Sequence, residues 1–253
     1  MKIIFQPKII FVIVISYVCL IGFSFVHLMF FIKHPDKMIF SKIILYILPL
    51  IIFSILLICW YINNYGNEDF KLKKTDRSIL LIVFVLTISY SFISDNVYKW
   101  EETFSRHRLS LPSMFEFEYY TFLYFLKSFV PLFCAPIIEE IIYRGLIDKI
   151  VKTKYAVVPI IISSLVFTLG HVLESISLIY VFCTGLMLGS IYYKTGRLIF
   201  SILAHSLINF TVVVFYYKSD PLDEMFLVLI VFMFLFVFST IRLWRYDKKT
   251  QIQ

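Results

Sequence analysis

The chain has 253 residues, of which 60% are hydrophobic, and its mean hydropathy is +0.86. Soluble globular domains carry a smaller apolar share, so the composition excludes an ordinary soluble protein and indicates a polytopic membrane protein. The net charge of +7 does not indicate nucleic-acid binding, because the lysines and arginines lie in short runs between apolar segments. The four cysteines are single and form no CxxC pair, which indicates neither a disulfide framework nor a cysteine-rich zinc site.

Eight apolar segments are long enough to be predicted as membrane-spanning helices, each of about 20 residues. The first, 9–32, is too long for the core of a signal peptide and lacks a small-residue cleavage site, so we expect a retained span. A longer connection, 98–119, is predicted as a loop outside the membrane. The remaining predicted spans, in chain order, are 43–62, 79–97, 120–147, 156–173, 177–193, 198–217 and 224–243. We therefore expect an all-α, polytopic membrane protein.

The distribution of positive charge predicts the topology. With the N-terminus in the cytoplasm, 15 of the 24 lysines and arginines fall on cytoplasmic segments and 7 on outer ones. The other two, Lys127 and Arg144, fall within spans. Positive residues concentrate on the cytoplasmic side of membrane proteins, so both termini are expected there. We expect a multi-pass protein of the cell membrane, and the low-alanine, phenylalanine-rich composition favours a bacterial source.

The polar residues and glycines divide the chain into three predicted parts. A core of residues 120–217 is preceded by the N-terminal helices and outer loop of 1–119. It is followed by the last helix and basic tail of 218–253. Five of the seven glycines lie in the second half, where Gly185 and Gly189 form a GxxxG pair that lets two helices approach closely. We expect the second half to be tightly packed and the first three spans to surround it.

Two glutamates and an arginine lie inside the predicted fourth span, in the stretch CAPIIEEIIYRG (134–145). A charged side chain at the centre of a bilayer costs about 2.5–3.5 kcal/mol on insertion scales, so such residues face a bundle interior and usually carry function. Glu140 and Arg144 are four residues apart, which places them on one helix face and predicts an ion pair. Two prolines precede them and are expected to kink the helix and help open a wet cavity beside Glu139.

Two later spans carry further pairs with helical spacing: Phe167 and His171 in FTLGH, and His205 and Asn209 in HSLIN. Glu139 and His171 lie at equal distances along the chain from the turn between the fourth and fifth spans. His205 lies about 12 Å into its span, at 1.5 Å per residue from the cytoplasmic end. We expect Glu139, His171 and His205 at similar depth, facing a cavity open to the cytoplasm.

A carboxylate, two imidazoles and an amide are suited to hydrolysis. A glutamate can take a proton from water, and histidine and asparagine can donate hydrogen bonds to the oxyanion that forms. If Arg144 holds Glu140 charged, Glu139 is left as the general base. The same residues permit a zinc site made of Glu139, His171 and His205 with water in the fourth position. No HExxH motif is present, so the usual soluble metalloprotease arrangement is excluded.

In their order and spacing, EExxxR, FxxxH and HxxxN resemble the motifs of the CAAX prenyl protease and bacteriocin-processing family, also called the Abi family, of intramembrane endopeptidases. The resemblance implies a helical bundle around a conical, cytoplasm-facing cavity and a metal-free, glutamate-dependent mechanism, with Zn²⁺ as the alternative. It implies that one glutamate and one histidine activate and position the water, while the other histidine and the asparagine form the oxyanion hole. By this resemblance Glu139 activates the water, His171 positions it, and His205 and Asn209 form the oxyanion hole. Glu140 is the fifth catalytic residue that the resemblance implies, and Arg144 and Phe167 are positioning residues.

We therefore expect a protease in the lipid bilayer that cleaves a hydrophobic or membrane-bound peptide, such as a pheromone or bacteriocin precursor. The alternative is a non-enzymatic bacteriocin-immunity or transporter-like protein that uses the buried charges to bind a ligand or relay protons. A transporter is disfavoured because the polar residues occupy one half of the chain and no internal repeat is evident. A third alternative is a scaffold for a cell-wall or signalling complex. The sequence predicts no nucleic-acid partner and sets no oligomeric state.

Overall fold

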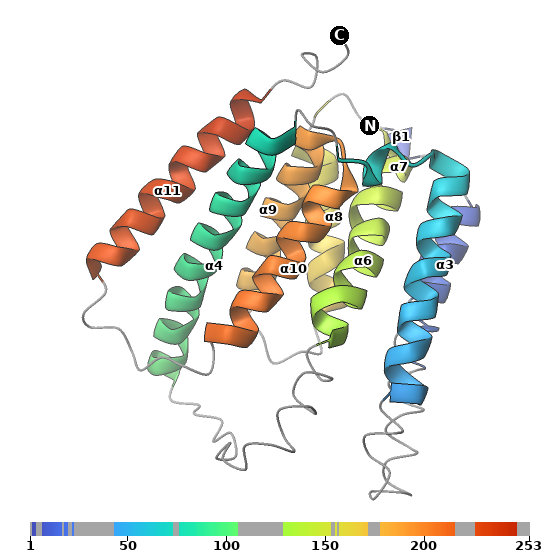
Figure 1. Ribbon diagram of the computed structural model, residues 1–253, viewed down its shortest axis with the longest axis horizontal. Helices are drawn as coiled ribbons and strands as arrows, with labels where there is room; N and C mark the ends of the chain where they lie inside the picture. Colours follow the sequence, from blue (N-terminus) through green and yellow to red (C-terminus); the bar gives the residue numbers. More distant parts are fainter. Residues whose placement is uncertain are drawn as a thin grey trace, which may run out of the picture. The chain divides into compact units, whose positions relative to one another are not determined.

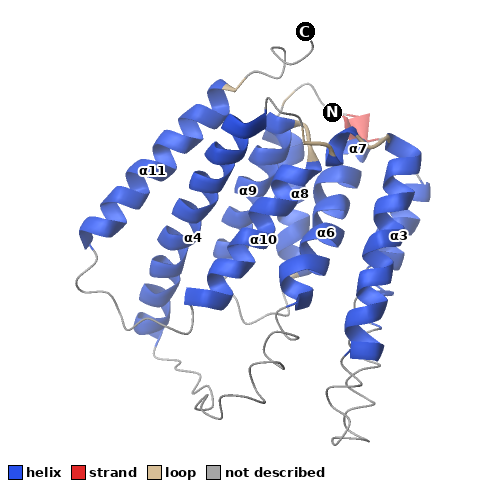
Figure 2. Ribbon diagram, in the orientation of Figure 1, coloured by secondary structure: helices blue, strands red, loops and turns tan. Residues whose placement is uncertain are grey.

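The computed structural model describes residues 2–3, 7–16, 18–19, 22, 43–72, 76–105, 129–152, 155, 157–171, 178–215 and 226–246. Figure 2 shows that the regular structure in these ranges is almost entirely helical, which confirms the all-α class. The exception there is one antiparallel pair of two-residue strands, β1 (Lys2–Ile3) and β2 (Val151–Lys152). The chain forms two compact units, Met1–Asn67 with Pro112–Lys152 and Glu68–Leu111 with Thr153–Gln253.

The described part of the first unit contains a short apolar helix, Pro7–Ser16, the long helix α3 and a composite helix that runs from η5 to α7. A wide π-helical turn, η2 (Ile43–Ile47), leads into α3 (Leu48–Tyr65). Gly66 ends α3 with a φ of 85°, a left-handed conformation that glycine adopts without steric cost. The composite helix consists of η5 (Val130–Cys134), α6 (Ala135–Glu140), η6 (Ile141–Leu146) and α7 (Ile147–Ile150).

The buried face of α3 packs against η5 and α6. Leu50, Ser54, Leu57 and Tyr61 are buried, and their spacing of three and four residues places them on one side of the helix. The composite helix alternates between α-helical and π-helical stretches, and its two π-helical stretches flank the glutamate pair in α6. Short π-helical stretches occur frequently at functional sites.

The second unit contains five longer helices. These are α4 (Arg77–Ser105), α8 (Val157–Gly170), α9 (Leu178–Thr195), α10 (Leu198–Phe215) and α11 (Phe226–Arg245), with a short turn, η3 (Glu68–Phe70), before α4. The prediction of a loop from residue 98 is wrong for its first part, because α4 continues to Ser105. No glycine or proline interrupts this stretch, so nothing in the backbone chemistry ends the helix earlier. The rest of the predicted loop, 106–119, lies outside the described residues.

Helix α4 lies between α10 and α11 and packs on both (Figure 1). It contributes Ile79, Val83, Leu86 and Tyr90 to a buried core, again at spacings of three and four residues. Residues of α9 and α10 and Leu243 of α11 complete this core. The expectation that the third predicted span merely surrounds the others is therefore wrong, because one face of this helix is an apolar stripe that the core buries.

Helices α8 and α9 approach closely, as the GxxxG pair predicts. A Cβ atom at Gly185 would lie 3.0 Å from both Cα and Cβ of Ser164. At Gly189 it would lie 3.2 Å from a methyl carbon of Ile160. The absence of side chains at these two positions lets the two helices pack at this distance.

Three helical segments in the described ranges are long and apolar enough to cross a membrane: Leu45–Tyr65, Arg77–Ser94 and Val228–Arg245. Shorter apolar helices are Pro7–Ser16, Val157–Gly170 and Leu198–Val212. Large apolar side chains are exposed along α11, as expected of a surface that contacts lipid. These helices identify a membrane protein, while the number of eight spans stays a prediction. Only part of the first predicted span is described, and Lys127 lies outside the described residues.

Candidate active site

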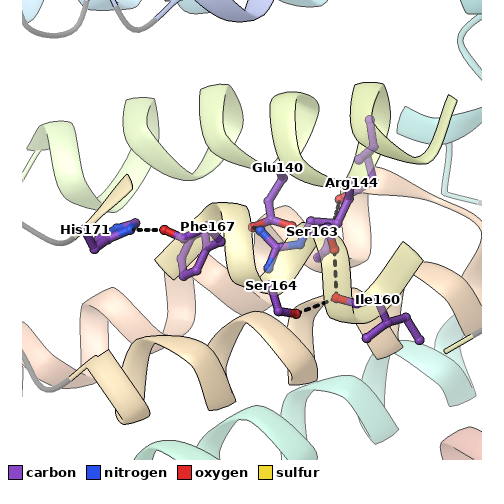
Figure 3. A network of polar contacts seen from close by, with 9 residues as sticks. Glu140, Arg144, Ile160, Ser163, Ser164, Phe167 and His171 are labelled. Carbon is purple, nitrogen blue, oxygen red and sulfur yellow. Dashed lines mark hydrogen bonds and ion pairs between the residues drawn. The ribbon is translucent and has the colours of Figure 1, made fainter. Parts of the chain in front are cut away.

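The glutamate pair occupies the last two positions of α6, and Arg144 follows in η6. Arg144 Nη1 donates a hydrogen bond to Glu140 Oε1 at 2.9 Å (Figure 3). The arginine side chain is 1% exposed and that of the glutamate 0%. The predicted ion pair is therefore confirmed, and it is buried.

The residues next to this ion pair along the helix are apolar and buried. Ile138, Ile141 and Ile142 are buried, and so is most of Tyr143. Charges attract more strongly in such surroundings than in water, and a buried charge that loses its partner is strongly destabilising. The ion pair therefore engages one of the two adjacent glutamates. Glu139 is only partly buried, so the two adjacent carboxylates lie in different environments.

His171 lies in the turn directly after Gly170, the last residue of α8. Its backbone N–H donates to the carbonyl oxygen of Thr168 at 3.0 Å, and its Nδ1 lies 2.8 Å from the carbonyl oxygen of Phe167 (Figure 3). A carbonyl oxygen can only accept, so Nδ1 carries a hydrogen. In a neutral ring, Nε2 is then the acceptor. That atom can accept a hydrogen bond from water, and the same arrangement would suit a zinc ligand.

Phe167 lies beside both histidines. Its ring centroid is 4.5 Å from that of His171, in a tilted arrangement, and 5.7 Å from that of His205, edge to face. Phe167 is 2% exposed and His205 is 4% exposed. The structure therefore brings a motif on α8 and a motif on α10 together around one aromatic ring. Asn209 follows His205 by about one turn of α10 and is partly buried.

The serines near these motifs are hydrogen-bonded within their own helix. Ser163 Oγ and Ser164 Oγ both donate to the carbonyl oxygen of Ile160, at 3.1 Å and 2.6 Å (Figure 3). Both serines are buried. Their hydroxyl hydrogens are directed at the helix backbone, so nothing in this arrangement marks either serine as an activated nucleophile.

The predicted site residues are divided between the two compact units of the chain. Glu139, Glu140 and Arg144 belong to the first unit. The residues of the second unit are Phe167, His171, His205 and Asn209. Sequence reasoning missed a second buried ion pair, between Asp76 and Arg197 in the second unit. The signal in the sequence is that Asp76 and Arg197 each lie shortly before an apolar run.

Comparison with protein families gives one match, of residues 121–211 to the model described as type II CAAX prenyl endopeptidase Rce1-like. The matched segment contains the EExxxR, FxxxH and HxxxN motifs and every predicted site residue. Comparison with curated proteins and with solved structures gave no match. The resemblance predicted from the motifs is thus confirmed over residues 121–211, which match the model of the Rce1-like type II CAAX prenyl endopeptidases, a family of proteases.

Proposed function

We propose that this protein is an intramembrane endopeptidase that uses water activated by Glu139 to hydrolyse a peptide bond in a hydrophobic or membrane-associated peptide. The observation that carries the proposal is the Rce1-like match, which covers all three polar motifs in one segment. The buried pair of Glu140 and Arg144 supports it, because it engages one of the two adjacent carboxylates.

In this proposal Glu139 removes a proton from the attacking water, whose oxygen bonds to the carbonyl carbon of the scissile peptide. His171 accepts a second hydrogen bond from the same water through Nε2, the ring atom that the Nδ1 contact with Phe167 leaves as acceptor. The proton then passes to the leaving nitrogen as the C–N bond breaks. One carboxylate thus serves as base and then as acid.

His205 and Asn209 are proposed to stabilise the negative charge that develops on the carbonyl oxygen. Both lie on α10, about one turn apart, so one helix presents two hydrogen-bond donors in a fixed relationship. Preorganised donors of this kind typically contribute a factor of about 10²–10³ each to the rate. Phe167 is proposed to hold the imidazole of His205 in place.

The proposed reaction requires no metal. Zinc bound by Glu139, His171 and His205 is the competing possibility, in which the metal would activate the water. The proposed setting is the membrane of a bacterial cell with both termini in the cytoplasm. Peptide pheromone and bacteriocin precursors are the proposed substrate class, because they are hydrophobic peptides that a membrane protease could reach.

The test uses purified full-length protein in lipid nanodiscs and two internally quenched probe peptides. One probe carries a farnesylated C-terminal CAAX sequence, and the other is an unprenylated hydrophobic peptide. Glu139→Gln keeps the size of the side chain but cannot accept the proton, so it should abolish cleavage. Glu68→Gln makes the same change at an exposed site and should cleave like the wild type.

Cleavage sites are read by mass spectrometry. Cleavage by Glu139→Gln at the wild-type rate would contradict the general-base role. A wild-type protein that cleaves neither probe but takes up protons or binds the peptides would favour the transporter-like or immunity alternative.

A further inference from the structure

A second buried ion pair joins the start of α4 to the turn between α9 and α10. Asp76 directly precedes α4, and Arg197 directly precedes α10. Arg197 Nη1 contacts Asp76 Oδ2, and the two side chains are 11% and 3% exposed. The same arginine also donates to the carbonyl oxygen of Lys71 at 3.4 Å.

The turn that carries Arg197 has a defined shape. Gly196 has a φ of 67°, and its N–H donates to the carbonyl oxygen of Tyr192 at 2.7 Å, which closes α9. Thr195 Oγ1 donates to the carbonyl oxygen of Ile191 at 2.8 Å and accepts from the backbone N–H of Arg197 at 3.4 Å. Helix α10 begins at the next residue. Arg197 is therefore the last residue of a hydrogen-bonded turn that leads into α10.

Helices α4 and α10 also share an apolar core. Val83 and Leu86 of α4 belong to the same buried cluster as Phe200 and Ala204 of α10. Apolar burial is non-directional, so by itself it distinguishes weakly between neighbouring registers of two helices. A charged hydrogen-bonded pair is directional, and in a buried site each charge needs its partner. The ion pair therefore supplies the specific contact that relates the ends of α4 and α10.

We propose that Asp76 and Arg197 are positioning residues that set the register of α10 on α4 and so determine where His205 and Asn209 lie. His205 follows Arg197 by eight residues and Asn209 by twelve, which is about 12 Å and about 18 Å along a straight helix. A slide or rotation at the start of α10 is transmitted to both side chains, because a helix moves as a rigid element. The link to catalysis rests on the proposed function, whereas the setting of helix register does not.

The first experiment measures helix register directly. Spin labels are placed on exposed positions of each helix, at Leu81 of α4 (63% exposed) and Leu203 of α10 (41% exposed), in full-length protein with the native cysteines replaced by alanine. Electron double resonance in nanodiscs then gives the distance distribution. Asp76→Asn and Arg197→Gln should shift or broaden this distribution. Asp69→Asn, the same change at a nearby aspartate outside the pair, should leave it unchanged.

The second experiment measures kcat and KM, per folded protein, on whichever probe peptide the wild type cleaves. Asp76→Asn should lower kcat about 10-fold to 100-fold, with KM within about twofold, because a displaced oxyanion donor acts in the transition state. Asp76→Glu keeps the charge and should recover most of the lost kcat. Arg197→Lys keeps the charge but lacks the planar guanidinium group, so its kcat should lie between those of Asp76→Asn and Asp76→Glu. This variant provides a test even if Asp76→Asn does not fold.

An unchanged distance distribution together with a wild-type kcat in Asp76→Asn and Arg197→Gln would overturn the proposal and leave the pair a purely stabilising role. If the wild type cleaves neither probe, the proposed function fails, and the distance measurement alone decides whether the pair sets helix register. If only the charge-conserving variants fold, wild-type distances and kcat in Arg197→Lys would likewise overturn the proposal.

Discussion

Arg144 Nη1 lies 2.9 Å from Glu140 Oε1, and both side chains are almost completely removed from solvent. The two residues belong to one composite helix, with the glutamate at the end of α6 and the arginine in the π-helical stretch that follows. A buried charge pair is tolerated because each partner compensates the other, so the loss of one should cost far more than the net worth of the pair.

Arg144→Ala should therefore destabilise the protein by about 3–5 kcal/mol, the usual cost of leaving one charge of a buried pair uncompensated. We expect a lower yield of monodisperse protein and earlier loss of the size-exclusion peak on heating. The double variant Arg144→Met with Glu140→Gln removes both charges and should recover much of that stability. Equal stability of Arg144→Ala and the wild type would show that water reaches the ion pair and compensates the remaining charge.

Phe167→Leu should lower activity through the two histidines. The substitution keeps an apolar side chain but removes the ring beside His171 and His205, and aromatic ring pairs contribute about 0.5–1.5 kcal/mol beyond their buried area. We expect kcat to fall about 2-fold to 10-fold and the NMR signals of both labelled histidine rings to shift. Phe210→Leu, at a half-exposed position of α10, is the matched control. Unmoved histidine signals would contradict a positioning role for Phe167.

Gly185→Ala should be more destabilising than Gly189→Ala. The new Cβ at Gly185 meets Cα and Cβ of Ser164 at 3.0 Å, so α8 and α9 must separate, and overpacking of this kind costs about 1–3 kcal/mol. At Gly189 the nearest atom is a methyl group of Ile160 at 3.2 Å, which can move. Thermal stability of the two variants in nanodiscs distinguishes these cases. The reverse order would contradict the packing observed between α8 and α9.

Asn209→Ala should separate the metal-free mechanism from zinc catalysis. An amide is a good oxyanion donor and a poor zinc ligand, so its loss should cost about 10²–10³ in kcat without changing metal content. We expect purified protein to contain no stoichiometric zinc by mass spectrometry and to keep its activity after strong chelation. Asn64→Ala, at an exposed position of α3, is the control. Bound zinc whose removal abolishes activity, and whose return restores it, would establish the zinc site instead.

Sequence reasoning predicted the features that depend on residues close together in the chain. A helix places residues four apart on one face whatever its surroundings, so the contacts of Glu140 with Arg144 and of Phe167 with His171 follow from spacing. Helices long enough to span a bilayer follow from the length of apolar segments, because the backbone must satisfy its own hydrogen bonds in lipid. The chemistry of the motifs follows from the residue types, and their family follows from their order.

Contacts between distant segments needed the folded structure. The pairing of Asp76 with Arg197, the ring of Phe167 beside His205, and the burial of α4 against α10 and α11 all join segments far apart in the sequence. Nearly every helix is apolar on all sides, so hydrophobic pattern alone does not indicate which face meets which neighbour. The π-helical stretches around the glutamates were likewise not evident from the residue pattern of this segment. Backbone geometry thus determined which residues share a helix face, while side-chain packing between helices determined which faces meet.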